Sequence, residues 1–511
     1  MRISIAQALD HGIQLAMSGQ HKKACTFFRG VLVHEPHNAE AMSRLGASLF
    51  DMGQIYEAFY RFERALKLRP KSAMHNTNYG TCLSELGHGE EAIPYLTKAI
   101  ALASRTKDVS PIVLGMLYNN LGNALTRNEQ FKDALSALEK GIAFDPEKPF
   151  AWHNRGIALC KLNRYEEAIL SLDRCIELAN TAHPETVSNV DIADVFYQRG
   201  LARLLLGELK DGFADYEARL VTHTNKNPNF GLPEKKKWYG QPEIAGKTIL
   251  VYAEQGFGDT MMSLRFLPHL VDAGARVQLV AQTGLRDFIR MPGVEVLPGG
   301  STLEYDYWVA LMSLPLMLGI EREDHIPGPW QPDLLPERIE KWREWCAPFD
   351  PRHLKVGVCW AGNFQHKNDN NRSIPLKVFQ RLFDVEGCTF ISLQQVRPED
   401  AAAVAELKYK LQPTEIEDWD DTAALISQLD MVITVDSAVA HLAGSLSVPT
   451  WVLVPSFSTD WRWGLKRTDC PWYPSITVYR PDADTTDWKK TVSRVASHLE
   501  AIKNQALASL G

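Results

Sequence analysis

The chain has 511 residues, enough for two to four domains, and its 45% apolar and 23% charged residues are ordinary for a globular protein. Its net charge of −7 excludes a general attraction to nucleic acid or anionic membranes, so an anionic ligand would need local donors. No apolar run approaches the ~20 residues of a membrane span, and the N-terminus lacks the pattern of a secretory signal. The eight cysteines form no CxxC pair, which predicts a reducing, cytoplasmic location.

A repeat with a period of 34 residues fills residues 1–222. Gly12, Gly46 and Gly80 are 34 residues apart, as are Gly122 and Gly156. An alanine follows each of these glycines after 12 residues, and a Phe or Leu follows after 16. This is the tetratricopeptide pattern, and with a degenerate sixth unit it predicts a solenoid of helical hairpins. We expect the small residues to let paired helices approach and the Phe or Leu to fill the groove to the next repeat.

Amide side chains recur two positions before the repeat glycines. Asn78, Asn120 and Asn154 hold this position in three consecutive units. Because an amide both donates and accepts hydrogen bonds, such a ladder can hold an extended peptide whatever its side chains. The array thus resembles the solenoid of the protein O-GlcNAc transferases, which implies a protein partner. The alternative is that these amides are simply solvated.

A stretch rich in Asn, Pro, Gly and Lys at residues 223–246 predicts a linker, followed by a first α/β domain at 247–335. The apolar strand Thr248–Tyr252 leads into the loop AEQGFGDT and a helix. This turn presents Asp259 at the carboxyl edge of the sheet, although capping of the helix is an alternative role. Two glycines allow a substrate to approach the backbone closely. The loop therefore contributes the candidate substrate-binding residues Gln255, Gly256 and Gly258. Glu254 lines the same loop, where it could bind the acceptor or replace Asp259 as the base.

A second α/β domain is predicted at residues 351–485, with a C-terminal amphipathic helix at 486–511. The strand Lys355–Cys359 precedes a polar loop, and the strand Phe390–Leu393 ends at a pair of glutamines. Candidate donor-binding residues after these two strands are Gly362, Asn363, Arg372 and Gln394.

The segment Asp421–Pro455 has the order helix, strand, turn, helix, strand. Met431–Val435 is an apolar, β-branched run typical of a buried parallel strand. The next helix would direct its unpaired N–H groups out of the sheet's carboxyl edge, which is a ready anion site. The residues at this turn are Asp436, Ser437, Ala438 and Val439, and His441 follows one turn later, where it can donate to a phosphate oxygen. The alternative is that Asp436 or Ser437 only caps the helix. We expect Asp421 and Thr422 to cap the first helix of the segment.

The motifs EQGFGDT, RSIP, SLQ, DSAVAHLAG and DWRW occur in the order typical of bacterial tetratricopeptide glycosyltransferases. The GFGD and DSAVAHL segments resemble those of the heptosyltransferase family, which usually has a glycine at the position of Ala438. The resemblance implies an α + α/β protein: a tetratricopeptide solenoid followed by a GT-B pair of Rossmann-like domains, with a C-terminal helix that crosses back to the first. It also implies that Asp259 is the general base, that His441 is a second catalytic residue and that Arg372 meets the donor phosphate. Gln394 would meet the ribose or base, and four aromatic residues would wall the sugar site or pack the core: Trp461, Trp463, Trp472 and Tyr473.

The implied enzyme needs no metal or cofactor. It would move a sugar from a nucleotide-diphospho-sugar to a hydroxyl of a protein, for example flagellin or another surface protein, docked by the array. One alternative is a heptosyltransferase-like enzyme acting on lipopolysaccharide or another glycan. A further alternative is a tetratricopeptide scaffold with an inactive transferase half, which the substitution at Ala438 favours.

Overall fold

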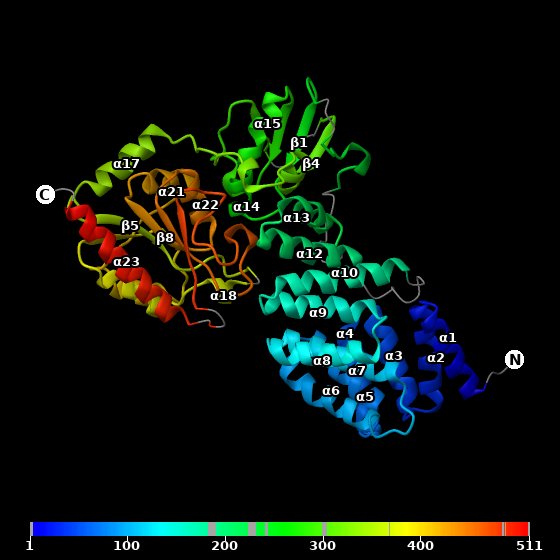
Figure 1. Cartoon of the computed structure of the whole chain (residues 1–511). Coiled ribbons are helices and arrows are strands. Elements are labelled where there is room, and N and C mark those ends of the chain that lie inside the picture. Colours follow the sequence, from blue (N-terminus) through cyan, green and yellow to red (C-terminus); the bar gives the residue numbers. More distant parts are fainter. Residues whose placement is uncertain are drawn as a thin grey trace. The chain divides into compact units, whose positions relative to one another are not determined.

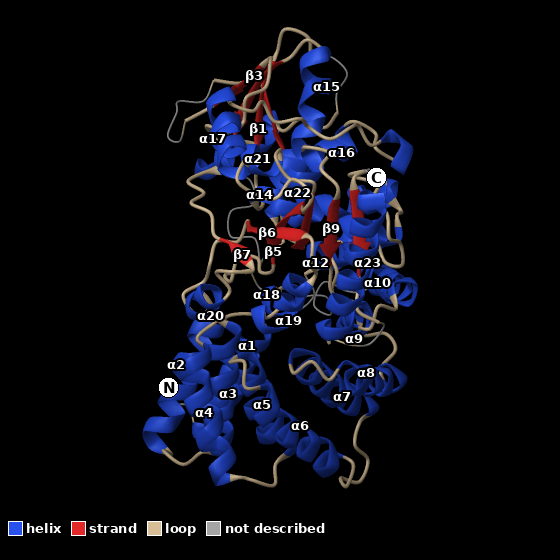
Figure 2. Cartoon of the chain, turned by 90° about the vertical axis from the view of Figure 1, so that its left-hand side faces the viewer, coloured by secondary structure: helices blue, strands red, loops and turns tan. Residues whose placement is uncertain are grey.

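The computed structural model describes residues 4–181, 191–222, 231–240, 244–298, 304–366, 368–482, 485 and 487–508. It divides into two compact units, Met1–Val195 and Phe196–Gly511 (Figure 1). Most of the predicted linker, residues 223–230 and 241–243, lies outside the described residues, as does the end of the predicted C-terminal helix at 509–511. Strands occur only in the second unit within the described part of the chain (Figure 2).

The first unit consists of successive helical hairpins, which confirms the predicted tetratricopeptide solenoid. Consecutive helices pack pairwise, α1 with α2, α3 with α4 and so on to α9 with α10. Their bounds are α1 Ile5–Met17, α2 His21–His34, α3 Ala39–Asp51, α4 Ile55–Leu68, α5 Ala73–Glu85, α6 Gly89–Ala103, α7 Pro111–Arg127, α8 Phe131–Phe144, α9 Pro149–Lys161 and α10 Tyr165–Thr181.

The repeat glycines have a direct steric reason. A Cβ added at Gly12 would lie 2.6 Å from Cε1 of Phe28, and one at Gly46 would lie 2.7 Å from Cε1 of Phe62. Each aromatic side chain therefore covers the glycine of its own hairpin, and Phe28 is fully buried there. Phe28 also belongs to one buried cluster with Leu45 and Leu49 of α3, so its ring faces the next repeat as well as its own hairpin, in line with the expectation.

The sixth hairpin, α12 (Ile192–Leu206) and α13 (Leu209–Tyr216), crosses into the second unit. It keeps the repeat geometry, since a Cβ on Gly200 would lie 2.7 Å from the backbone nitrogen of Tyr216. A short 3-10 turn, η1 (Glu217–Leu220), follows it. The compact units thus divide the chain before the predicted end of the array at residue 222.

The first sheet of the second unit has four parallel strands in the order β3-β2-β1-β4. Ile249 of β1 is in register with Val277 of β2 on one side and with Tyr307 of β4 on the other. Trp238, predicted to pack against this domain, is buried, and its backbone N–H donates to the backbone carbonyl of Trp308 at 2.8 Å. The elements are η2 Glu234–Lys236, β1 Thr248–Tyr252, α14 Phe257–Ser263, η3 Leu264–Phe266, α15 Leu267–Asp272, β2 Arg276–Val280, η4 Thr283–Leu285, β3 Val294–Val296, β4 Tyr307–Ala310, η5 Leu311–Ser313, α16 Leu314–Met317 and η6 Glu323–His325.

The second sheet has six parallel strands in the order β10-β9-β8-β5-β6-β7, so both sheets are of the predicted parallel α/β type. Strand β8 is buried along its whole length, as its continuous apolar sequence predicts. The elements are α17 Pro336–Cys346, β5 Leu354–Cys359, α18 Asp369–Arg372, α19 Leu376–Phe379, η7 Gln380–Asp384, β6 Cys388–Ser392, α20 Ala401–Glu406, β7 Leu411–Gln412, α21 Trp419–Ile426, β8 Met431–Val435, α22 Ala438–Ser445, β9 Thr450–Leu453, η8 Trp461–Trp463, β10 Ile476–Tyr479 and α23 Trp488–Ala508.

Two expectations for this region are wrong. Helix α21 is capped by Asp418, whose carboxylate accepts from the backbone N–H of Asp421 at 2.8 Å. Asp421 itself is fully buried and accepts hydrogen bonds from Arg338, Lys341 and the indole of Trp342. The C-terminal helix α23 does not cross back, because its apolar face packs into the core of the second sheet through Trp488, Val492, Val495 and Leu499.

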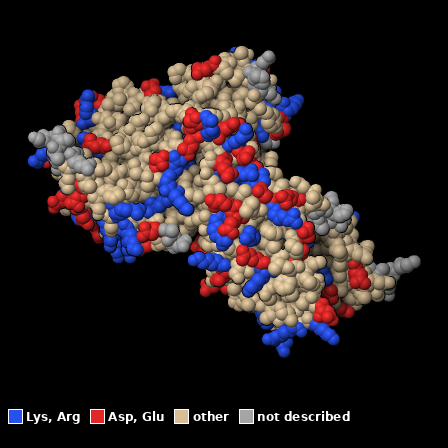
Figure 3. Space-filling model, in the orientation of Figure 1, with Lys and Arg blue, Asp and Glu red and all other residues tan. Residues whose placement is uncertain are grey.

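Basic and acidic side chains are interspersed on both units in the face that Figure 3 shows. Among the helices of the described residues, none combines the length and the apolar character that crossing a membrane requires.

Candidate functional site

The two predicted loops meet in the second unit. Helix α14 follows β1, and helix α22 follows β8, at the carboxyl ends of their sheets. The two helices pack against each other, and a Cβ on Gly258 would lie only 2.5 Å from Cδ2 of His441. Gly258 is thus required by the imidazole of the second motif, and the loops that carry Asp259 and Ser437 belong to one site.

Asp259 has a defined position within this site. Its Oδ2 accepts from the backbone N–H of Gly256 at 2.8 Å, so it stabilises the first turn of α14 from the third helical position. Its Oδ1 accepts from the guanidinium of Arg462. The predicted capping role therefore holds in modified form, and it coexists with a strong ion pair.

Arg462, in η8, is the central cation of the site, although it was not among the predicted site residues. Only 4% of its side chain is exposed, and its Nη1 donates to both carboxylate oxygens of Asp460 at 2.9 Å. Burial alone would lower its pKa, but the charges of Asp460 and Asp259 raise it. The sequence signal was the DWRW motif, in which a charged pair is embedded among tryptophans that predict burial.

His441 is enclosed by aromatic side chains. It is 5% exposed, its Nδ1 lies 3.2 Å from the hydroxyl of Tyr473, and its ring centroid lies 5.4 Å from that of Trp463. Burial, assisted by the positive charge of Arg462, lowers its pKa to about 3, so the imidazole is neutral. The four aromatic residues predicted around the sugar site are all buried. Packing is therefore the role that their burial supports.

The turn after β8 has the predicted position but a different hydrogen-bonding pattern. Ser437 is the N-cap of α22 without a side-chain cap bond, and its Oγ lies 3.1 Å from Oγ1 of Thr434. Ala438 is the first residue of α22, and Val439 is buried beneath it. The first N–H groups of this helix have no intrahelical acceptor, as at any helix start. Burial and the neighbouring Asp460 raise the pKa of Asp436 to about 6, although Arg372 opposes this shift.

Arg372 lies at the same sheet edge, after β5. A Cβ on Gly362 would lie 2.6 Å from Nη2 of Arg372, so this glycine makes room for the guanidinium. The Arg372 side chain is 12% exposed, and its Nε is 3.6 Å from Oδ1 of Asp369. Asp369 is held by Arg397 at 2.6 Å. Asn363 is exposed, and its Oδ1 accepts from the N–H of Gln365 at 3.0 Å, which places it on the surface of this loop.

Gln394 holds the end of β5. Its Oε1 accepts from the N–H groups of Trp360 at 3.1 Å and Ala361 at 2.9 Å. Its Nε2 donates to the carbonyl of Gln395 at 2.9 Å. The predicted contact with a ribose or base stays a prediction, while the observed bonds fix the loop that carries Gly362.

The predicted peptide-binding amides are engaged between repeats. Asn78 Nδ2 donates to Ser43 Oγ, and Asn154 Nδ2 donates to Asn119 Oδ1, both at 2.9 Å. Asn120 is half-buried beside Asn119. Two of the amides already donate one hydrogen bond from Nδ2 to the preceding repeat. Peptide binding at these positions stays a prediction.

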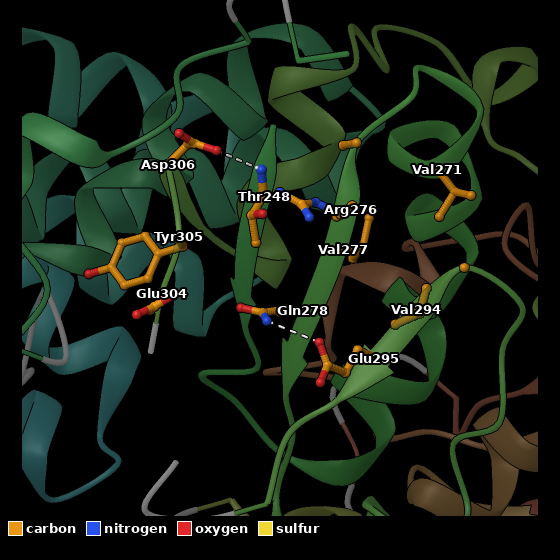
Figure 4. Close-up of a pocket in the computed structure, with 12 residues that line it drawn as sticks. Thr248, Val271, Arg276, Val277, Gln278, Val294, Glu295, Glu304, Tyr305 and Asp306 are labelled. Atoms are coloured by element: carbon orange, nitrogen blue, oxygen red, sulfur yellow. Dashed lines mark hydrogen bonds between the residues drawn. The ribbon is translucent and has the colours of Figure 1, made fainter. Parts of the chain in front are cut away.

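A separate cavity of about 840 Å³ lies at the other end of the first sheet (Figure 4). Its lining includes Thr248 and Arg276, the first residues of β1 and β2, and Asp306, which accepts from the N–H of Thr248 at 2.8 Å. It contains none of the predicted site residues. Within the described part of the chain, no group of His, Cys, Asp and Glu has the arrangement of a metal site.

Comparison with known proteins identifies the class of the first unit. Models of the tetratricopeptide repeat match residues 76–106, 114–144 and 149–182. The first unit therefore contains tetratricopeptide repeats, and an α/β region follows them in the chain.

Similar proteins are found both for nearly the whole chain and for the repeats alone. The chain is 26% identical to Protein FlbA of Caulobacter vibrioides in an alignment of 513 residues, which covers 94% of this chain and 82% of FlbA. It is 27% identical over 153 residues to Tetratricopeptide repeat protein 6 of Homo sapiens, covering 30% of this chain and 28% of that protein. Among solved structures, the type IV pilus biogenesis factor PilW matches 46% of this chain and 97% of its own, with 19% identity and a TM-score of 0.37.

Proposed function

We propose that the α/β unit is a metal-independent glycosyltransferase of the GT-B type. It moves a sugar from a nucleotide-diphospho-sugar to a hydroxyl of a protein acceptor that the tetratricopeptide array docks. The observation that carries this proposal is the contact of Gly258 with His441, which brings the two heptosyltransferase-like loops to one place. Two parallel sheets that face each other with the carboxyl ends of their strands are a common setting for nucleotide binding.

The donor would bind on the side of the six-stranded sheet. The diphosphate would receive hydrogen bonds from the hydroxyl of Ser437, the N–H groups at the start of α22 and the guanidinium of Arg372. These donors are preorganised, because Gly362 leaves space for Arg372 and because α22 is anchored by its contact with α14. The net charge of the chain gives no such attraction, so the local donors have to supply it.

Asp259 is the proposed general base on the other side. The two bonds that fix it use one lone pair on each oxygen, and each oxygen keeps another that can accept the proton of an acceptor hydroxyl. Arg462 orients this carboxylate through their ion pair, and its positive charge also compensates the carboxylate of Asp460. His441, neutral and buried, would serve by supporting α14 rather than by proton transfer.

A scaffold with an inactive transferase half is the second candidate. It is favoured by the burial of His441 and by the pairing of Asp259 with Arg462, which leave neither predicted catalytic residue free of protein contacts. A glycan acceptor, as in the heptosyltransferases, differs from the main proposal only in what the site glycosylates.

The test combines binding and turnover on the full chain. Uridine, guanosine, adenosine and cytidine diphosphates are screened by thermal shift, and the matching nucleotide-sugars are then assayed for release of the diphosphate. We expect one nucleotide to raise the melting temperature by mass action. We expect Asp259→Asn to lower diphosphate release by about 10² to 10⁴-fold. The control is Asp272→Asn, which changes an exposed carboxylate at the end of α15.

If no diphosphate or nucleotide-sugar stabilises the protein, the scaffold function replaces the transferase. Product analysis separates the acceptors: sugar on protein supports the main proposal, and sugar on a glycan with no labelled protein supports the heptosyltransferase-like alternative.

A further inference from the structure

The last hairpin of the array belongs to the α/β unit through buried side chains. Phe213 of α13 is 2% exposed, and its ring centroid lies 5.7 Å from that of Trp461 and 6.5 Å from that of Trp472. Trp461 immediately precedes the central cation Arg462. The side chains that enclose the site are therefore partly held by a helix that the repeat pattern assigns to the array.

Tyr216, at the end of α13, contacts the loop that carries the proposed base. Its side chain is 2% exposed, and its hydroxyl accepts from Nε2 of Gln255 at 2.8 Å. Burial raises its pKa, and the positive charge of Arg219 opposes this shift. The ring additionally packs against Trp461, with centroids 6.3 Å apart.

Arg219, in η1, contacts the same loop one residue earlier. Its Nη2 donates to Oε1 of Glu254 at 2.7 Å and to the hydroxyl of Ser313 at 2.9 Å, and its Nη1 donates to Glu217 at 2.8 Å. Arg219 and Glu254 are each 5% exposed. Glu254 also accepts from the N–H of Met312 at 3.2 Å, so its carboxylate is held from two sides. A contact of Glu254 with an acceptor stays a prediction, whereas the observed role of its carboxylate is this buried ion pair.

These contacts act on adjacent positions. Arg219 fixes residue 254, Tyr216 fixes residue 255, and the N–H of residue 256 then binds Asp259. Buried hydrogen bonds and ion pairs of this kind contribute little to the free energy of unfolding compared with apolar packing, but they specify one conformation of the loop. Apolar packing of the hairpin would not require the guanidinium of Arg219 and the phenol of Tyr216 to bind the same loop.

We propose that Tyr216 and Arg219 are positioning residues of the candidate site, which hold the loop from Glu254 to Asp259 in place for chemistry. The inference deepens the proposed function, because the loop is the one that carries the proposed base. Its structural part, the fixing of the loop, does not depend on which reaction occurs there.

The first test is hydrogen–deuterium exchange of the full chain with Tyr216→Phe. This variant keeps the ring and its packing and removes only the hydroxyl. We expect amide exchange in peptides spanning residues 253–260 to be about five-fold faster, as for loss of one buried hydrogen bond. The matched control is Tyr165→Phe in the array, where a buried tyrosine loses its bond to Asn163 Oδ1 at 3.1 Å. It should leave those peptides unchanged. Unchanged exchange in Tyr216→Phe, or an equal effect of the control, would overturn the proposal.

The second test separates positioning from stability. The substrate is the hexose derivative of whichever nucleoside diphosphate (uridine, guanosine, adenosine or cytidine) gives the largest thermal shift. With it, Tyr216→Phe should lower kcat about ten- to a hundred-fold and leave KM for the donor unchanged. Arg219→Lys should act in the same direction, because a single ammonium cannot span Glu254, Ser313 and Glu217. Equal kcat values in wild type and Tyr216→Phe would refute the positioning role. Turnover by none of the proteins would refute the proposed function, while the exchange result would still decide whether the hairpin fixes the loop.

Discussion

Acid sensitivity of the second unit should depend on His441. The ordinary pKa of a histidine is 6.5, and burial with the nearby Arg462 lowers that of His441 to about 3. The native state therefore favours the neutral ring, while the unfolded chain takes up a proton as the pH falls below 6.5. The contribution of His441 to the free energy of unfolding is therefore highest above pH 6.5, and it falls progressively as the pH is lowered towards 3. Between pH 7 and pH 5 this linkage removes about 2 kcal/mol of unfolding free energy.

The assay is urea unfolding at both pH values, followed by tryptophan fluorescence. Twelve of the 13 tryptophans lie in the second unit, because Trp152 alone falls within residues 1–195, so the signal reports on the unit that contains the site. His441→Asn is the variant, since its amide can still reach the Tyr473 hydroxyl but takes up no proton. We expect the loss of stability between pH 7 and pH 5 to be about 2 kcal/mol smaller in the variant than in wild type. Equal losses would show that His441 titrates normally and would refute its assignment as a buried neutral group.

Three further predictions concern the same unit. Gly258→Ala should lower its stability by about 1 to 3 kcal/mol in urea unfolding, because the new Cβ would lie 2.5 Å from His441, whereas Gly328→Ala, with no atom within 4 Å, should not; equal effects would contradict the contact. Asp436→Asn should raise stability by about 1 to 3 kcal/mol at pH 8 and by about a third as much at pH 4.5, because folding raises the pKa of this carboxyl from 3.8 to about 6 and the cost of ionising it in the native state therefore builds up between these two values and is complete above pH 6; a pH-independent effect would argue against it. A fragment of residues 191–511 should unfold cooperatively in calorimetry, and one of residues 223–511 should not, because it lacks the buried Phe213, Tyr216 and Arg219; equal unfolding of both would show that the hairpin is dispensable.

The parts of the fold that follow from local pattern were predictable. The repeat glycines and the Phe or Leu residues 16 positions later place the array hairpins, because the two helices of a hairpin are neighbours in sequence. The continuous apolar run Met431–Val435 predicts β8 for a similarly local reason. The boundary at residue 222 was set by the same repeat pattern, which carries no information about the partner against which the last hairpin packs.

The parts of the site that depend on distant contacts were not predictable. Arg462 reaches Asp259 across 203 residues of sequence, and nothing near either residue specifies the other. Gly258 was interpreted as room for a substrate, but the atom that needs the room belongs to His441. Gln394 has the position of a ligand contact, yet its oxygen is used by the backbone of the neighbouring strand end.

The proposed function requires that the edge of the six-stranded sheet binds a diphosphate next to Asp259. Isothermal titration of the full chain with the nucleoside diphosphate that stabilises it most tests this directly, with Arg372→Ala and the exposed control Arg381→Ala measured alongside. We expect binding to the wild type and to Arg381→Ala, with at least ten-fold weaker binding to Arg372→Ala, because this variant loses a charged hydrogen-bond donor. Equal affinity of all three proteins, or no heat with any nucleoside diphosphate, would contradict it.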